Sequence, residues 1–140
     1  MTTPLWCLVG FVAWTIVLLL AIAFARVGAV LTGVKKANEF PSGVPHGGDG
    51  YWRLNRAHMN CLENLPIFGA LVLVTAVAGI HAPILDTLAK TYLGARIAQS
   101  VTHVASGSVI AVNVRFTFFV IQCVCVIWMM LVIWRTQSGG

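Results

Sequence analysis

The chain has 140 residues, of which 59% are hydrophobic and only 9% are charged, and its mean hydropathy is +0.88. Soluble domains carry about 25% charged residues, so this composition argues against a soluble protein and predicts one compact integral membrane domain over residues 1–140. Nine Lys and Arg residues outnumber four Asp and Glu residues, for a formal net charge of +5. Because no basic run is longer than Lys35-Lys36, the excess favours lipid headgroups or an anionic ligand over nucleic acid.

The first predicted element runs from Leu5 to Val34 and is almost continuously apolar, with Arg26 as its charged interruption. A membrane-spanning helix needs about 20 such residues, so this segment can cross a bilayer and project beyond one surface. A signal peptide is the alternative, and we reject it because the apolar core is too long and no charged segment precedes it. Arg26 either extends its long side chain back to the membrane interface or contacts a ligand.

Residues 35–50 contain prolines and glycines that break regular structure, and they predict a loop. A second helix is predicted from about Tyr51 to Ile80, with a kink at Pro66. Its first half carries four polar residues at spacings of three and four: Arg53, Arg56, Asn60 and Glu63. Residues at these spacings lie on one side of a helix, so we expect a single charged face.

This charged face lies at the mouth of an apolar segment, where it cannot meet lipid. A charge at the bilayer centre costs about 2.5–3.5 kcal/mol on insertion scales, so the face must contact protein or water. Two interpretations remain: a structural ladder of ion pairs between helices, or a binding site for a ligand with charges of both signs. An intramembrane cluster of this kind favours the binding site.

A third helix is predicted from about Ile84 to Ser108, and it is the least apolar of the set. Its polar residues at helical spacing are Arg96, Gln99 or Ser100, and His103. Such a face packs inward or against a neighbouring subunit. His103 alone is typical of a hydrogen-bonded packing residue, but its alignment with Arg96 also makes it a candidate for a ligand site.

A fourth helix, from roughly Asn113 to Trp134, is almost entirely apolar after Arg115, and a short polar tail follows at residues 135–140. Aromatic residues near both of its ends are typical of the belts at membrane interfaces. The four cysteines all lie in apolar segments, where they are interpreted as packing residues. We predict neither a disulfide nor a metal site.

Four spans place both termini on one side of the membrane and the first and third loops together on the other. Most Lys and Arg residues gather on the loop side, so the positive-inside rule places these loops and the mouth of the polar site in the cytoplasm. Five arginines can lie near that end: Arg26, Arg53, Arg56, Arg96 and Arg115. The acidic residues are too few to pair with them, which predicts an anion that the chain does not supply.

The second helix carries a recognisable signature, Arg53-x-x-Arg56-Ala57-His58-x-Asn60-x-x-Glu63-Asn64-Leu65-Pro66, followed by Ile67-Phe68. It resembles the signature of the MAPEG family, membrane-associated proteins of eicosanoid and glutathione metabolism that include microsomal glutathione transferases. The resemblance extends along the whole chain: four spans, a Lys-Lys exit from the first helix, Ala95-Arg96 on the third, and an arginine near the start of the fourth.

The resemblance implies a homotrimer that holds glutathione between neighbouring subunits, at a site open to the cytoplasm. Carried onto this chain, it implies that five residues hold the glutathione backbone: Arg53, Arg56, Asn60, Glu63 and Arg96. It further implies that Arg115 stabilises the thiolate, since a nearby cation lowers the pKa of a thiol and the thiolate is the nucleophile. His103 and Arg26 are further candidates for the same site.

The chain also departs from the family pattern. The family's eicosanoid enzymes carry tyrosines on the third helix that contact glutathione, and the corresponding positions here are Gln99 and His103. We therefore expect a glutathione transferase or peroxidase that acts on lipophilic electrophiles rather than specific eicosanoid chemistry. The alternative is a non-enzymatic lipid-binding or scaffold member of the same fold. A small transporter is disfavoured because no inverted repeat is evident.

Overall fold

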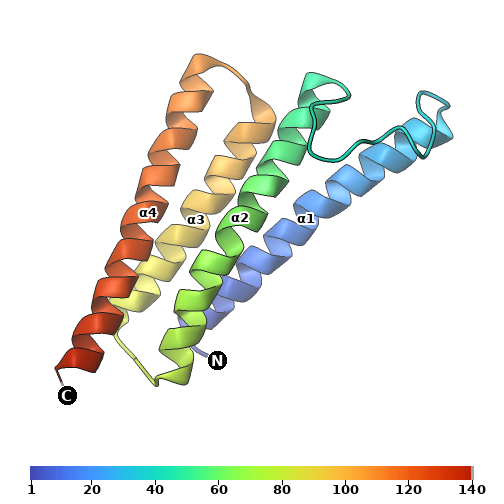
Figure 1. Ribbon diagram of the computed structural model, residues 1–140. Helices are drawn as coiled ribbons and strands as arrows, with labels where there is room; N and C mark the ends of the chain where they lie inside the picture. The colour runs from blue at the N-terminus through green and yellow to red at the C-terminus, as the bar shows by residue number, and fades with distance from the viewer. Residues whose placement is uncertain (140) are drawn as a thin grey trace.

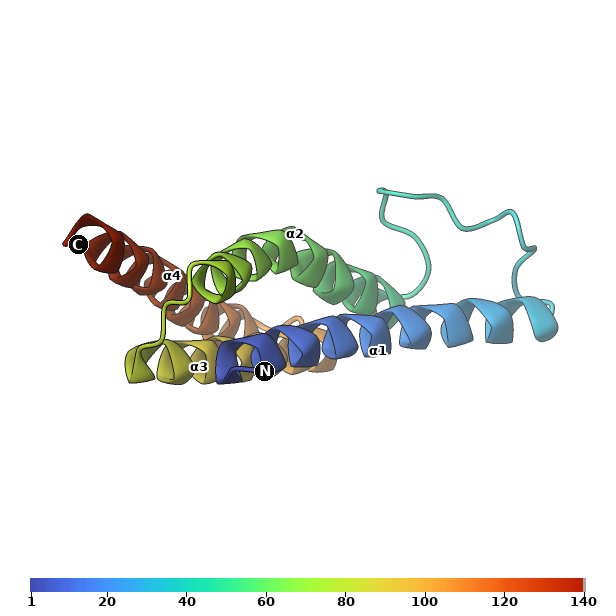
Figure 2. The same ribbon diagram turned by 90° about the horizontal axis from the view of Figure 1, so that it is seen from below.

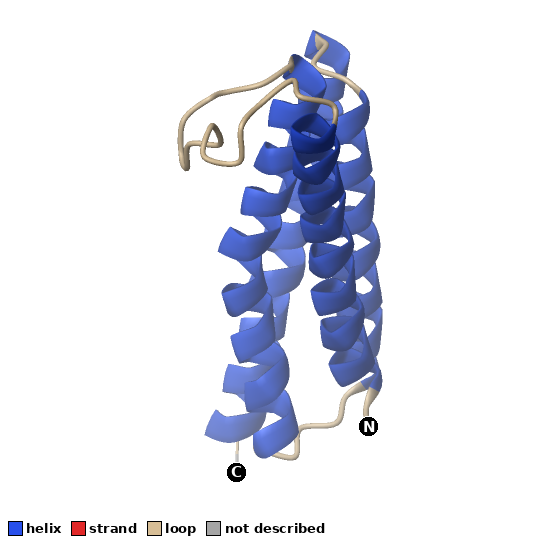
Figure 3. Cartoon of the chain, turned by 90° about the vertical axis from the view of Figure 1, so that its right-hand side faces the viewer, coloured by secondary structure: helices blue, strands red, loops and turns tan. Residues whose placement is uncertain are grey.

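The computed structural model describes residues 1–139 and consists of four α-helices: α1 (Thr3–Leu31), α2 (Asp49–Val77), α3 (Pro83–Ala105) and α4 (Val109–Ser138). Figure 1 shows an elongated bundle with both termini at one end and the α1–α2 and α3–α4 loops at the other. Figure 3 shows the long α1–α2 loop standing out at this loop end. The predicted all-helical membrane bundle and the placement of its termini are confirmed.

Three of the helices, α1, α2 and α4, are long and apolar enough to cross a membrane. The more polar α3 has 23 residues, or about 35 Å at 1.5 Å per residue, which still exceeds the ~30 Å hydrocarbon core of a bilayer. It packs against all three other helices, whereas α1 and α4 do not meet within the described residues. The polar side chains of α3 therefore have protein partners available on several sides, as helix packing in membranes requires.

Three helices end earlier than the sequence predicts. The third, α3, ends at Ala105 rather than Ser108, and the other two are each followed by a glycine in the left-handed conformation. The first ends at Leu31 rather than Val34, since Gly33 has φ +71°. The second ends at Val77 rather than Ile80, before Gly79 at φ +65°. Glycine adopts such angles without the steric penalty of a Cβ atom, so both exits from a helix are set locally.

The fourth helix is longer than predicted at both ends. It begins at Val109 because the Ser108 hydroxyl accepts a hydrogen bond from the Ala111 backbone N–H at 3.2 Å and caps the first turn. It continues to Ser138, so the predicted helix end near Trp134 is wrong, and the polar residues 135–138 extend the helix. Gly140 lies outside the described residues.

The core lies where α1, α2 and α3 meet around three aromatic rings. Phe68 and Tyr92 stack with their centroids 4.3 Å apart and their planes within 2° of parallel. Phe11 lies 6.1 Å from Phe68 and 6.0 Å from Tyr92, and all three side chains are buried. Aromatic pairs at these distances stabilise beyond the apolar area they bury, so this cluster joins three helices at one level.

Pro66 lies inside α2 without ending it. A proline at this point cannot donate to the carbonyl four residues earlier, and its ring pushes against the preceding turn. Figure 2 shows that the axis of α2 is curved rather than straight, as proline within a helix is expected to produce. Pro66 comes after the polar half of α2, so the bend lies between the predicted charged face and the apolar half of the helix.

Candidate functional site

A cleft of about 310 Å³ opens between α2, α3 and α4 in the half of the bundle nearest the loop end. Its lining is drawn from all three helices: Arg56, Asn60, Gln99, His103, Val112, Arg115, Phe116 and Phe119. The lining residues from α2 and α3 are all polar, whereas α4 contributes an apolar and aromatic wall together with Arg115. No carboxylate belongs to this lining, so the two cations face the same volume without an acid between them.

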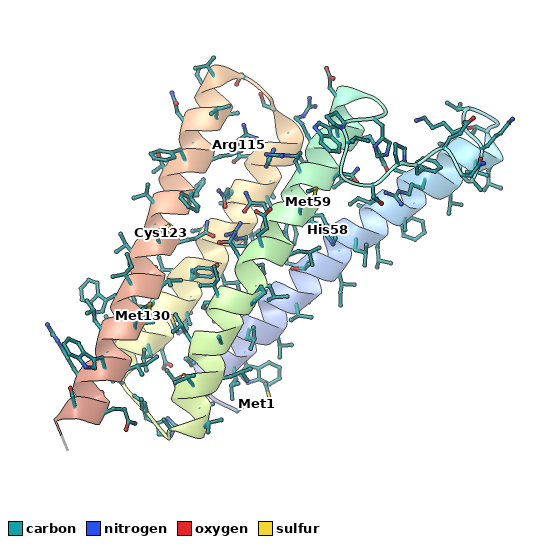
Figure 4. The ribbon with its side chains drawn as sticks, viewed as in Figure 1. Met1, His58, Met59, Arg115, Cys123 and Met130 are labelled. Atoms are coloured by element: carbon teal, nitrogen blue, oxygen red, sulfur yellow. The ribbon has the colours of Figure 1, made fainter. Side chains whose placement is uncertain are left out.

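The helical repeat explains why these residues meet. Residues four apart lie on the same face of a helix, and each of the three helices contributes such a pair. The pairs are Arg56 and Asn60 on α2, Gln99 and His103 on α3, and Arg115 and Phe119 on α4. Figure 4 shows Arg115 on the part of α4 nearest the loop end, with Cys123 and Met130 on later turns.

Arg96 lies beneath this cleft rather than in its wall. It is 1% exposed, and its Nη1 atom donates to the Asn60 side-chain oxygen at 2.6 Å. Its guanidinium carbon lies 5.7 Å from the centre of the Phe11 ring and 6.0 Å from that of Tyr92, distances at which a cation is attracted to a ring face. Its Nε and Nη2 atoms are buried without a hydrogen-bond partner in the described structure. Arg96 therefore orients Asn60 from below, and Asn60 lines the cleft above.

Arg53 and Glu63 lie at the two ends of the charged face of α2, outside the cleft lining. Arg53 Nε donates to the Val104 backbone carbonyl at 3.2 Å, in the last turn of α3, where carbonyl groups lack helical partners and a cation is favoured. Glu63 is exposed. Within one chain, therefore, the charged face of α2 does not form a single site. Its middle two residues, Arg56 and Asn60, line the cleft, and its two end residues do not.

Arg26 lies apart from the other predicted site residues. Its Nε atom donates to the Tyr51 hydroxyl at 2.7 Å, and its guanidinium carbon lies 5.4 Å from the centre of the Phe40 ring. The Lys35 ammonium approaches the same ring at 5.6 Å. These contacts join α1, the α1–α2 loop and the start of α2. Within one chain the five arginines do not converge on one volume, since Arg56 and Arg115 alone line the cleft.

Gln122 is a buried polar residue that the sequence analysis missed. It is 2% exposed, and its Nε2 atom donates to Gln99 Oε1 at 3.0 Å and to the Phe118 carbonyl at 2.9 Å. Gln99 Nε2 in turn donates to the Arg115 carbonyl at 3.1 Å. The sequence offered one signal for it: Gln122 is a carboxamide side chain in an otherwise apolar span, two helical turns after Arg115.

Comparison with known protein families decides the affiliation of the chain. The sequence model of the MAPEG family matches residues 4–134 and so reaches all four helices. The chain belongs to the MAPEG family. No curated protein matches it. The resemblance carried by the signature on α2 is confirmed, and this MAPEG chain is an integral membrane protein of a family that acts in glutathione or eicosanoid metabolism.

Proposed function

We propose that this MAPEG protein binds glutathione in the cleft between α2, α3 and α4 and activates its thiol towards lipophilic electrophiles, as a transferase or peroxidase. The observation that carries the proposal is the placement of Arg56 and Arg115 in one cleft whose lining holds no carboxylate. Glutathione is a tripeptide with two carboxylates, one ammonium group and a thiol. Guanidinium groups bind carboxylates through charge-assisted, often bidentate, hydrogen bonds, so the cleft suits the anionic part of this substrate.

The division of the lining into two walls supports distinct roles. Arg56 binds a carboxylate, while Asn60 and His103 offer hydrogen bonds to the peptide. Arg115 lies on the same helix as Phe116 and Phe119, so a thiol beside its guanidinium is also next to the apolar wall. A nearby cation lowers the pKa of that thiol and stabilises the thiolate, and an electrophile entering from the bilayer meets it in alignment.

The transferase step then needs no group beyond the two substrates, whereas the peroxidase reaction consumes a second glutathione, forms the disulfide and releases an alcohol and water. The thiol proton leaves to solvent as the thiolate forms. The sulfur forms a bond to the electrophilic carbon, and the leaving group departs with the electron pair of the broken bond. The Arg115 guanidinium stabilises the negative charge on the thiolate sulfur before the attack, and the apolar wall excludes water from the electrophile.

The ammonium group of glutathione requires an acid, and Glu63 is the one in the signature. It is exposed at the middle of a 29-residue apolar helix, where a carboxylate facing lipid is costly. We therefore include a homotrimer in the proposal, in which a neighbouring subunit covers Glu63 and the open side of the cleft, with the mouth in the cytoplasm. A native mass of three chains in detergent is expected, and a monomer would remove the shared site.

The deciding experiment follows the thiolate directly. Bound glutathione is expected to give the ultraviolet difference band of a thiolate at neutral pH, and Arg115→Ala is expected to abolish that band while much of the binding remains. Turnover of a chlorodinitrobenzene is expected to fall with it. Arg135→Ala, an arginine on the other end of α4, is the matched control.

Two results would change the conclusion. Glutathione binding without a thiolate band in the wild-type protein favours the non-enzymatic lipid-binding or scaffold alternative. A band that survives Arg115→Ala moves the activating role to His103, which lines the same cleft, or to Arg26 of a neighbouring subunit.

A further inference from the structure

The two buried glutamines, Gln99 on α3 and Gln122 on α4, form a chain of hydrogen bonds that ends on Arg115. Gln122 donates to Gln99, and Gln99 donates to the Arg115 backbone carbonyl. Both side chains are 5% exposed or less. A carbonyl oxygen has two lone pairs, so the Arg115 oxygen can accept this bond in addition to its bond within α4.

The donor and acceptor roles in these hydrogen bonds are set by the Arg115 carbonyl. A backbone carbonyl can only accept, so Gln99 must present its NH₂ group to it, and the Gln99 oxygen must then face Gln122. Gln122 must present its own NH₂ group, since two oxygens would otherwise face each other. Neither carboxamide can be flipped alone, so removing the Gln122 donor leaves the buried Gln99 oxygen without the partner that holds the Gln99 side chain in place.

The spacing of the contacts fixes α4 along its axis. Gln99 reaches Arg115 on one side and Gln122 on the other, and these two residues lie seven positions apart on α4, or about 10 Å along the helix. A shift of α4 along α3, or a rotation about its axis, would break both bonds. Interhelical hydrogen bonds of this kind hold membrane helices in register.

We propose that Gln122 is a positioning residue, which acts through Gln99 to hold the Arg115 backbone against α3 and thereby places the Arg115 guanidinium in the cleft. The proposal rests on the proposed function of Arg115. It predicts more than a loss of stability, because the orientation of Gln99 and the position of Arg115 change together when the Gln122 donor is removed.

The test begins without glutathione. Arg115 precedes Phe116, and no other arginine in the chain precedes a phenylalanine, so labelling arginine carbonyls with ¹³C and phenylalanine nitrogens with ¹⁵N selects one peptide bond in a nuclear magnetic resonance spectrum. Gln122→Met and Gln99→Met are both expected to shift this carbonyl signal in the same direction. Gln137→Met makes the same substitution at an exposed position of α4 and is expected to leave the signal in place.

The second measurement uses bound glutathione. In Gln122→Met the pH midpoint of the thiolate band is expected to move up towards that of free glutathione, which leaves on the order of tenfold less thiolate at neutral pH, in line with the cost of a small misplacement in a site. Gln122→Asn keeps the carboxamide but shortens its reach, and an intermediate shift is expected. It also serves as the test variant if Gln122→Met does not fold.

The outcomes separate this inference from the proposed function. An unchanged carbonyl signal in the folded variants would overturn the inference, and so would a changed carbonyl signal with an unchanged thiolate midpoint, because the glutamines would then be structural only. If the wild-type protein shows no thiolate band, the proposed function fails and the role of Gln122 in placing the guanidinium fails with it, whereas the carbonyl signal still decides whether Gln122 holds the Arg115 backbone.

Discussion

Arg96 and Arg115 carry the same charge on neighbouring helices but have opposite surroundings. Arg96 is 1% exposed, lies against the rings of Phe11 and Tyr92, and bonds to Asn60. Arg115 is half-buried in the wall of an open cleft that it shares with Arg56. Packing closes the first guanidinium off from a ligand, whereas the second faces an open volume.

The comparison separates two uses of an arginine in a membrane protein. A buried cation with few partners is expensive to keep, so the surroundings of Arg96 indicate a structural role, in which its long side chain fills space and orients Asn60. The surroundings of Arg115 leave its charge available for an anion. Substitutions at the two positions should therefore affect different properties, namely stability for Arg96 and thiolate formation for Arg115.

The largest effect on stability is expected from Arg96→Ala. Truncation opens a cavity among Phe11, Tyr92 and Asn60, and comparable truncations of large buried side chains cost about 3–5 kcal/mol. Unfolding followed in detergent by circular dichroism measures this loss. Arg96→Met keeps the volume and removes a charge that is costly to bury, so it is expected to be much closer to the wild type. A stable Arg96→Ala protein that fails to bind glutathione would instead place Arg96 in the site.

A smaller effect, on affinity rather than stability, is expected for the exposed charges of α2. Arg56→Ala and Glu63→Ala should each weaken glutathione binding by about 2–4 kcal/mol, the usual cost of truncating one partner of a charge pair at an interface. Calorimetry measures the loss, and Lys90→Ala, on an exposed part of α3, provides the control. If both variants fold and bind as the wild type does, the charged face of α2 is structural.

The smallest effect is expected from loss of the hydrogen bond between Arg26 and Tyr51. The other tyrosine of the chain, Tyr92, provides a comparison. Tyr51→Phe removes the hydroxyl that accepts from Arg26, at a cost of about 1 kcal/mol, and should speed proteolysis of the loop over residues 35–48. Tyr92→Phe removes a buried hydroxyl that has no partner in the described structure, so it should be neutral or stabilising. Equal effects of the two variants would contradict the contrast in hydrogen bonding.

The helices and the family signature could be predicted because both depend on local sequence. Apolar runs of spanning length identify α1, α2 and α4, and the signature falls within one continuous helix. Some boundaries were missed because capping residues can be assigned to either neighbour. Ser108 was interpreted as the end of the third helix, whereas its hydroxyl caps the start of α4.

The directions of individual side chains could not be predicted, since they depend on packing between helices. Arg96, Gln99 and His103 form one stripe on α3, but α3 contacts three helices, and the stripe divides between them. Arg96 reaches α2, while Gln99 reaches α4. The partner of Arg26 depends on the path of a loop, and the importance of Gln122 depends on which residue of α3 lies opposite it.

The unequal lengths of the helices have a consequence for hydration. The 23 residues of α3 are six fewer than the 29 of α2, a difference of about 9 Å, and in Figure 1 the loop end of α3 lies below those of α2 and α4. Because α3 ends below its neighbours at the loop end, the cleft lined by His103 and Arg56 opens closer to water than the ends of α2 and α4 alone would place it. Hydration can then hold the two arginines of the cleft, Arg56 and Arg115, before any anion arrives, without acids of their own.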